Sequence, residues 1–314
     1  MTIPASRLLS RLGCVCLWLV VMALAGCMEP GADSAYAPEY VEAPSQRVPS
    51  ARYVLGVHPL HNPTRLFEVY GPIVDLLNQH IPEAHFTLEA SRNYAEYERK
   101  LYAAYYDLAL PNPYQTLNAL GFGYKVFGKM ADDEAFRGVI LVRRSSDINE
   151  VSDLKGRAVS FPAPTALAAA MLPQAFLHRH GLPPSDYEAK YVGSQESSIL
   201  NAVTGDTAAA ATWPPPWEAF QKTHPEQAAT LRVQWETPPL VNNGLIARAD
   251  FPPDILARVG AVLFSLHESE QGRALLARLP LTRFEPASDA TYAPVRGFLA
   301  EFDRDVRALA ELPQ

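Results

Sequence analysis

Residues 161–172, with the sequence FPAPTALAAAML, combine a strand end, a turn with two prolines and an alanine-rich helix start. Free backbone N–H groups point out of a helix N-terminus, so this arrangement often holds an anion. Within this turn and helix start, Thr165 carries the one hydroxyl. The stretch therefore predicts the shape of an anion cradle around Pro164 and Thr165, lined mainly by small apolar side chains.

Two histidines, His58 and His61, stand three residues apart just after a predicted strand. A metal site needs three or four converging ligands. The nearest further candidate in the sequence is His85, which alternates within a strand pattern. We therefore favour an imidazole that hydrogen-bonds a ligand over a metal centre, and we expect no cofactor.

One pattern is typical of enzymes, because Ser152 and Lys155 fit the S-x-x-K nucleophile motif of penicillin-recognising enzymes. Ser152, however, opens a short helix that stops at Gly156, which is the position of a helix cap. The sequence also lacks the G-x-S-x-G, H-E-x-x-H and phosphate-loop motifs. We expect a binding protein and no enzyme, and a Ser/Lys enzyme is the disfavoured alternative from another class.

The first residues have the features of a targeting segment. Basic Arg7 and Arg11 precede an apolar run at 14–25 that is too short to span a membrane comfortably. Residues 24–27, LAGC, resemble a bacterial lipobox, which implies a signal peptide at 1–26 and a lipid on Cys27. An ordinary secretory signal and an uncleaved anchor are the alternatives. We expect a periplasmic lipoprotein, on either the inner or the outer membrane.

Composition limits the remaining classes. The chain has 314 residues, 48% of them hydrophobic, which suffices for a buried core and favours two compact units. A formal charge of −7 without a basic cluster argues against a nucleic-acid partner.

Residues 28–50 are rich in Pro, Ala, Ser and Glu, so we expect a flexible tether over 27–50.

Strands alternate with helices along the rest of the chain, which predicts the α/β class with parallel-rich sheets flanked by helices. A first set has strands at 52–57, 84–89 and 106–110 and helices at 65–78 and 94–104. A second set has strands at 138–143, 158–161, 188–192 and 208–212 and helices at 147–156, 165–180 and 197–204. A strand at 244–248 and helices at 254–279 and 292–312 close the chain.

This order resembles the periplasmic solute-binding proteins of ABC importers, and the phosphonate/phosphite-binding branch in particular. The likeness covers roughly 52–285. It rests on an ordered series of segments: VRR at 142–144, SDINEVSDLKGRAVSF at 146–161, YVGSQES at 191–197 and VTGDTAAAAT at 203–212. The resemblance implies a two-lobed, type II-like periplasmic-binding-protein fold with the ligand cleft between the lobes.

The same resemblance implies where the lobes and the site lie. One lobe would comprise 51–138 plus 240–314 and the other 139–239, with hinges at 137–138 and 242–244. The cleft would be lined by loops at the carboxyl ends of strands. These loops supply the predicted ligand-binding residues His58, His61, Asn62, Tyr94, Asn112, Tyr114, Pro164, Thr165, Ser194, Gln195, Trp213 and Asn242.

Several of these positions depart from the pattern of the family, in which the turn carries a Ser-Thr-Ser run. Here Pro164 and Ala166 replace the two serines. Gln195 stands where the family has a histidine, and Trp213 stands where an aspartate holds an amino group. Each lost hydrogen bond to a charged group costs roughly 1.5–3 kcal/mol. Two lost hydroxyls would therefore remove about two to four decades of affinity for an oxyanion.

Aromatic side chains are concentrated beside the predicted cleft, at Trp213, Trp217 and Phe220. Because apolar lining suits ligands of low polarity, we expect a lipid or sterol-like ligand. An oxyanion of the phosphonate, phosphite or phosphate type, bound for ABC import, is the alternative, and the tryptophans would then be packing residues.

We expect a monomer that hands its ligand to an ABC permease or another transport partner, with a membrane sensor as a further possibility.

Overall fold

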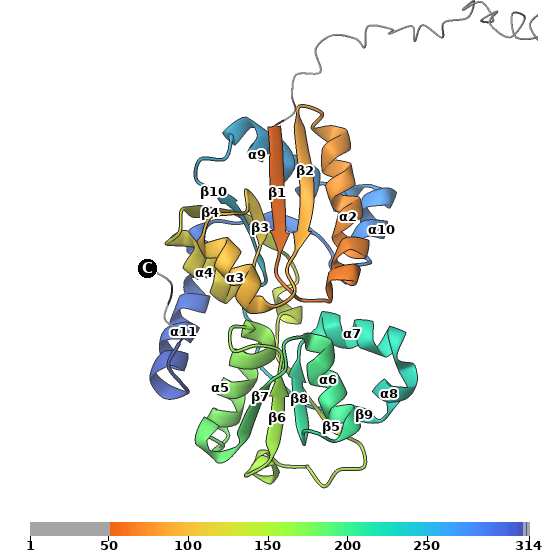
Figure 1. Cartoon of the computed structure of the whole chain (residues 1–314), viewed down its shortest axis with the longest axis vertical. Helices are drawn as coiled ribbons and strands as arrows, with labels where there is room; N and C mark the ends of the chain where they lie inside the picture. Colours follow the sequence, from red (N-terminus) through yellow and green to blue (C-terminus); the bar gives the residue numbers. More distant parts are fainter. Residues whose placement is uncertain (1–50, 310–311, 313–314) are drawn as a thin grey trace, which may run out of the picture. The chain divides into compact units, whose positions relative to one another are not determined.

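The structure, a computed structural model, describes residues 51–309 and 312. Two sheets organise this part of the chain, and Figure 1 shows the elements around them. One sheet has six strands in the order β11-β4-β10-β3-β1-β2, and the other has five in the order β7-β6-β8-β5-β9. We refer to the elements around the six-stranded sheet as the first lobe and to those around the five-stranded sheet as the second lobe. The predicted signal peptide, Cys27 and the tether lie outside the described residues.

The first lobe contains two stretches of the chain. The first stretch comprises β1 (Ala51–Val57), α2 (Pro63–His80), β2 (Ala84–Ala90), α3 (Tyr94–Tyr102), β3 (Leu108–Leu110), α4 (Pro113–Leu120) and β4 (Tyr124–Met130). The second comprises β10 (Gly244–Arg248), α9 (Pro253–Phe264), η6 (Leu266–Glu268), α10 (Glu270–Leu276) and β11 (Phe284–Pro286). β1 pairs in parallel with β2 and β3, whereas β10 runs antiparallel to β3 and β4.

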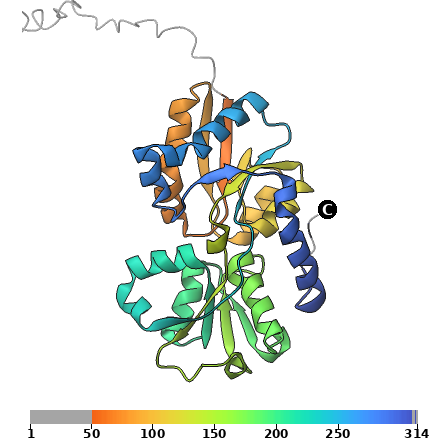
Figure 2. The same cartoon turned by 180° about the vertical axis from the view of Figure 1, so that it is seen from behind.

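The second lobe follows the short η2 (Asp133–Ala135), and Figure 2 shows it from behind. Its first elements are β5 (Val139–Arg143), η3 (Val151–Leu154), β6 (Ala158–Phe161), η4 (Leu167–Met171), α5 (Leu172–Arg179) and η5 (Pro184–Asp186). The remainder are β7 (Glu188–Tyr191), α6 (Gln195–Thr204), β8 (Ala209–Thr212), α7 (Pro214–Thr223), α8 (Pro225–Ala229) and β9 (Leu231–Glu236). β6 pairs in parallel with β7 and β8, and β5 lies antiparallel to β8 and β9.

Both sheets are therefore mixed, whereas the sequence predicted parallel-rich sheets. The antiparallel pairings involve β5, β9, β10 and β11 and lie at or near the passages between the lobes. A helical crossover holds consecutive strands parallel, but β5 and β10 each follow a connection from the other lobe. No crossover constrains the direction in which they enter their sheets.

Prolines begin two helices where the sequence predicted cleft loops. Pro113 lies in the first turn of α4, whose N-cap is Asn112. Pro214 opens α7, whose N-cap is Trp213. Proline suits the first helical position because its fixed φ is already helical and the missing N–H would have no intrahelical partner there. The predicted cleft loops therefore end directly in helix N-termini.

The last helix, α11 (Ala293–Asp305), follows η7 (Asp289–Tyr292) and leads toward the second lobe. At its start, the Tyr292 hydroxyl donates to the Asn242 carbonyl across 2.9 Å. After its end, Arg307 contacts Gln174 of α5. Figure 2 shows α11 beside the second lobe. Contacts that join the two lobes are therefore made by the chain end as well as by the cleft loops.

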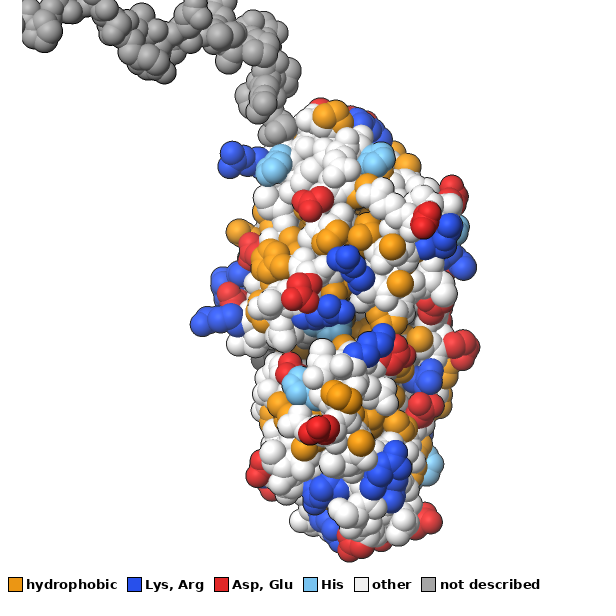
Figure 3. All heavy atoms as spheres, turned by 90° about the vertical axis from the view of Figure 1, so that its right-hand side faces the viewer, with side chains coloured by type: hydrophobic (Ala, Val, Ile, Leu, Met, Phe, Trp, Pro, Cys, Tyr) orange, Lys and Arg blue, Asp and Glu red, His pale blue; other side chains and the backbone are white. Residues whose placement is uncertain are grey.

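Charge on the surface is mixed. On the face drawn in Figure 3, Lys and Arg side chains are interspersed with Asp and Glu side chains. This face thus offers no broad basic patch of the kind that tracks a nucleic-acid backbone. Among the described residues, no helix combines the length and the apolar character needed to cross a bilayer.

Candidate binding site between the lobes

The turn at 162–166 connects β6 to the π-helical turn η4 in the second lobe. Ala166 has an extended backbone and no side-chain cap, so nothing local satisfies the start of the helix. The backbone N–H groups of Leu167, Ala168 and Ala169 have no hydrogen-bond acceptor within the described residues. The first bonded donor within η4 is the N–H of Ala170, which reaches the Ala166 carbonyl at 2.7 Å.

The usual acceptors of two of these N–H groups are occupied by other donors. In an α-helix, the N–H of Ala168 would reach the Pro164 carbonyl and that of Ala169 the Thr165 carbonyl. Instead, Arg307 Nη2 donates to the Pro164 carbonyl at 2.6 Å, and Asn112 Nδ2 donates to the Thr165 carbonyl at 2.9 Å. As the first N–H groups of a helix, those of 167–169 have no intrahelical acceptor and remain available to a ligand.

Asn112 is fixed in place by a capping box at the start of α4. Its Oδ1 accepts from the Gln115 N–H at 3.1 Å, and Gln115 Oε1 accepts from the Asn112 N–H at 3.1 Å. The same Gln115 donates through Nε2 to Glu98 on α3 at 2.9 Å. These reciprocal bonds satisfy two otherwise unpaired backbone donors and hold the Asn112 amide toward the second lobe.

Glu98 brings a carboxylate close to the predicted cradle. Burial raises the pKa of Glu98, and hydrogen bonding from the Thr165 hydroxyl and from Gln115 partly opposes that rise. The hydroxyl predicted to hold an oxyanion thus interacts with a carboxylate of the first lobe. In this arrangement the backbone N–H groups of 167–169 are donors without an acceptor among the described residues.

A second cross-lobe contact joins Tyr94 and Gln195. Gln195 Nε2 donates to the Tyr94 hydroxyl at 3.3 Å, and its Oε1 accepts from Thr212 Oγ1 at 3.0 Å. All three side chains are buried, and burial raises the pKa of Tyr94. Gln195 opens α6, whose N-cap Ser194 accepts from the Ser197 N–H at 3.0 Å. The Tyr94 hydroxyl keeps its own hydrogen for a further acceptor.

The two cleft histidines are neutral at physiological pH. Burial lowers the pKa of His58 to about 4, although its hydrogen bond to the Leu110 carbonyl opposes the change. Burial, followed by the charges of Arg65 and His58, lowers the pKa of His61 to about 3. Because a carbonyl can only accept, His58 Nδ1 carries the hydrogen at 2.9 Å from Leu110 and Nε2 is an acceptor.

The other predicted polar residues have structural contacts. Asn62 is exposed, caps α2 through Arg65 and donates to Glu196 of the second lobe at 3.3 Å. Asn242 Nδ2 donates to the Ala131 carbonyl at 2.7 Å, which ties together the two connections between the lobes. Tyr114 is buried near the start of α4. In the described part of the chain, no group of three His, Cys, Asp or Glu side chains could hold a metal ion.

The aromatic surface predicted beside the cleft is used for packing. Trp213 is 3% exposed and packs edge-on against Phe136, with ring centroids 5.4 Å apart. Trp217 stacks on Phe220 at 6.1 Å, within a separate apolar cluster of the second lobe. These side chains help to hold their own elements together, which accounts for their size and position without an apolar ligand.

Sequence reasoning found the free N–H groups of this helix start but did not find Glu98, Gln115 or Arg307. The spacing Asn112-Pro-Tyr-Gln115 is a readable capping-box signal for α4 and would have drawn attention to Gln115. Arg307 has no comparable signal, because its contact with Pro164 spans 143 residues.

A family model described as "ABC transporter, phosphonate, periplasmic substrate-binding protein" matches residues 55–292. The chain belongs to this family. This result confirms the resemblance inferred from the segments between 142 and 212.

A curated relative, the probable ABC transporter phosphite-binding protein PhnD1 of Prochlorococcus marinus, is 24% identical over 127 residues. That alignment covers 38% of this chain and 43% of the relative, so it spans less than half of the relative's length.

Solved structures share the fold. A binding protein component of an ABC phosphonate transporter from Pseudomonas aeruginosa has a TM-score of 0.75 at 16% identity, covering 82% of this chain and 88% of that one. PhnD1 from Prochlorococcus marinus in complex with methylphosphonate has a TM-score of 0.74 at 18% identity, covering 81% and 99%. The predicted α/β fold of two lobes is confirmed.

Proposed function

We propose that this protein binds a small oxyanion of the phosphonate type between its lobes and delivers it to an ABC permease. The observation that carries the proposal is the set of three backbone N–H groups, of Leu167, Ala168 and Ala169, that have no acceptor among the described residues. A helix N-terminus with free N–H groups favours negative charge whatever the neighbouring side chains are. A cradle of this kind needs no serine hydroxyls.

Among the other polar groups near the turn, Arg307 supplies one cation, at the Pro164 carbonyl. His58 and His61 are neutral at pH 7, and Glu98 places a carboxylate nearby. The site therefore offers several hydrogen-bond donors and little net positive charge. A small anion whose oxygens can accept several hydrogen bonds suits this set.

This proposal replaces the prediction of an apolar ligand with the alternative derived from the sequence. A lipid or sterol would leave buried N–H groups without acceptors, at a cost of about 1–3 kcal/mol each. The aromatic residues that suggested an apolar ligand, Trp213 and Trp217, have packing partners in the protein. Family membership and the methylphosphonate-bound relative also favour the oxyanion.

The family description indicates a periplasmic protein. Lipid anchoring through Cys27, a monomeric state and an ABC permease as the partner stay predictions. The lobe limits, 51–138 plus 240–314 and 139–239, likewise stay predictions.

Isothermal titration calorimetry with the purified protein tests the proposed ligand class. We would titrate methylphosphonate, phosphite, phosphate, methanesulfonate and a fatty acid in separate experiments. Saturable binding of at least one phosphorus oxyanion, weakened by added salt, is the expected result. Saturable binding of the fatty acid alone, insensitive to salt, would overturn the proposal.

A further inference from the structure

Two carbonyl groups of the anion-binding turn are held by side chains from outside the second lobe. We propose that Asn112 and Arg307 are positioning residues, which complete the N–H cradle when the lobes close. The inference rests on the proposed function, because it concerns how that same site acquires its affinity. Neither residue needs to touch the ligand.

Side-chain donors and backbone N–H groups compete for the carbonyls of this turn. The carbonyls of Pro164 and Thr165 are the α-helical partners of the N–H groups of Ala168 and Ala169. Arg307 and Asn112 occupy these carbonyls at 2.6 and 2.9 Å. The chain then forms a π-helical turn, in which the N–H groups of Ala170 and Met171 both lie within hydrogen-bond reach of the Ala166 carbonyl. Without these side chains, the carbonyls could accept from N–H groups that we assign to the anion.

The two side-chain donors come from segments far from the turn in the sequence. Asn112 is the N-cap of α4 in the first lobe, and its contact with Thr165 spans 53 residues. Arg307 follows α11, whose preceding turn is hydrogen-bonded to the connection between the lobes at Asn242. Both contacts therefore cross from one part of the fold to another. Separation of the lobes would break the Asn112 contact and release the Thr165 carbonyl.

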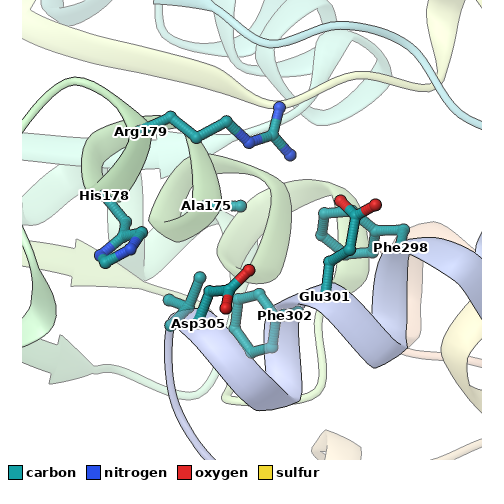
Figure 4. Close-up of a pocket in the computed structure, with 8 residues that line it drawn as sticks. Ala175, His178, Arg179, Phe298, Glu301, Phe302 and Asp305 are labelled. Atoms are coloured by element: carbon teal, nitrogen blue, oxygen red, sulfur yellow. The ribbon is translucent and has the colours of Figure 1, made fainter.

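Arg307 is held in place by several groups. Its Nε donates to Gln174 at 3.0 Å, and its guanidinium lies over the Phe302 ring at 5.0 Å from the centroid. Figure 4 shows α5 and α11 on opposite sides of a cavity of about 250 Å³. Its lining residues are Ala175, His178, Arg179, Phe298, Glu301, Phe302, Asp305 and Val306. Arg307 lies outside this lining, and its contacts with Pro164 and Gln174 join the chain end to the turn and to α5.

The consequence is a coupling between closure and binding. Closure frees N–H groups for the anion, and a bound anion in turn favours the closed arrangement, because such coupling is reciprocal. Arg307 also places a positive charge beside the turn, which should favour an anion further. The cradle would then bind weakly in an open molecule and tightly in a closed one.

Four variants of the full chain test this inference with methylphosphonate as the probe. Asn112→Ser keeps a side-chain acceptor for the cap of α4 but cannot reach the Thr165 carbonyl. Arg307→Gln removes the charge and the donor to Pro164, and Arg307→Lys restores the charge and one donor. The matched control is Arg304→Gln, which removes an exposed arginine whose ion pair is with Asp305. Affinity, dissociation rate and ligand-free melting temperature would be measured for each.

We expect Asn112→Ser and Arg307→Gln each to weaken binding about tenfold through faster dissociation, the scale of one hydrogen bond near a charged group. Arg307→Lys should recover part of the loss, and Arg304→Gln should match the wild type. In ¹⁵N-alanine spectra, ligand should shift the amide signals of Ala168 and Ala169 in the wild type and less in Arg307→Gln. If Asn112→Ser fails to fold, the Arg307 pair still decides the question.

Two negative results can be told apart. If the wild type binds methylphosphonate and the variants bind it equally well, the positioning role is wrong while the proposed function stands. If the wild type binds none of the oxyanions, the proposed function is wrong and this inference falls with it.

Discussion

Gln195 of the second lobe donates a hydrogen bond to the hydroxyl of Tyr94 in the first lobe, across 3.3 Å and 101 residues of sequence. Thr212 fixes the other end of the same amide at 3.0 Å. Gln195 stands where the family resemblance led us to expect a histidine. A neutral amide that is tied on both sides positions the Tyr94 hydroxyl without adding a charge to the cleft.

Replacement of Tyr94 by Phe removes that hydroxyl and leaves the buried Gln195 amide without its acceptor. We expect affinity for methylphosphonate to fall about tenfold and the free energy of unfolding to fall by about 1–3 kcal/mol. Calorimetric titration and urea denaturation would measure the two effects. The matched control is Tyr97→Phe, because the Tyr97 hydroxyl is buried and has no partner in the described chain. This control should keep or raise stability; an equal loss in both variants would contradict the role of the Tyr94 contact.

Replacement of Leu167 by Pro removes one N–H of the proposed cradle. Ala166, the preceding residue, already has the extended backbone that proline requires before it. Because Leu167 is buried, the control is Leu167→Ala, which loses the side chain and keeps the N–H. We expect the proline variant to bind methylphosphonate about 10- to 150-fold more weakly than the alanine variant, the range for a bond to a charged group. Equal affinities of the two variants would exclude this N–H as a donor.

The sequence was sufficient to predict most elements that follow a local pattern. The amphipathic helix at 65–78 is present as α2, and the strand at 158–161 is present with the same bounds as β6. The predicted strand–turn–helix order after β6 is also present, as β6, η4 and α5, whereas binding of an anion there stays a prediction. Prediction failed at α4 and α7, because prolines in a cleft loop also begin helices.

The rest of the site depends on contacts between distant residues. Thr165 looked like the anion donor because it carries the one hydroxyl of the turn, but Glu98, 67 positions earlier, interacts with that hydroxyl. Trp213 looked like cleft lining because it follows a strand end, but Phe136 provides a packing partner. In both cases the partner is set by tertiary packing, which residue types and spacing do not specify.

His58 should make the protein less stable in mild acid. Its pKa in the folded state is about 4, whereas an unfolded histidine has a pKa near 6.5. As pH falls through this window, the unfolded chain takes up a proton that the buried imidazole does not, so the free energy of unfolding decreases. At pH 4 the free energy of unfolding should be about 3 kcal/mol lower than at neutral pH.

Urea denaturation between about pH 4 and 7 measures this effect in the wild type and in His58→Gln. The variant keeps a donor for Leu110 and should show a shallower dependence on pH. His85→Gln, which changes an exposed imidazole on β2, serves as the control. Identical pH profiles for wild type and His58→Gln would contradict the buried, neutral state of His58.

Replacement of Trp213 by Ala should destabilise the fold. The side chain is 3% exposed, and loss of a buried aromatic typically costs about 3–5 kcal/mol. Trp235→Ala on β9 removes a half-buried indole and should cost less. Urea denaturation would measure both. Unchanged stability together with loss of fatty-acid binding in Trp213→Ala would instead support an apolar ligand.

The most direct test of the central claim is the titration of methylphosphonate into the wild-type protein at low and at high salt. The N–H cradle predicts saturable binding of one ligand per chain, which weakens as salt screens the anion. Absence of binding at low salt by methylphosphonate, phosphite and phosphate alike, with saturable binding of a fatty acid, would contradict the oxyanion site.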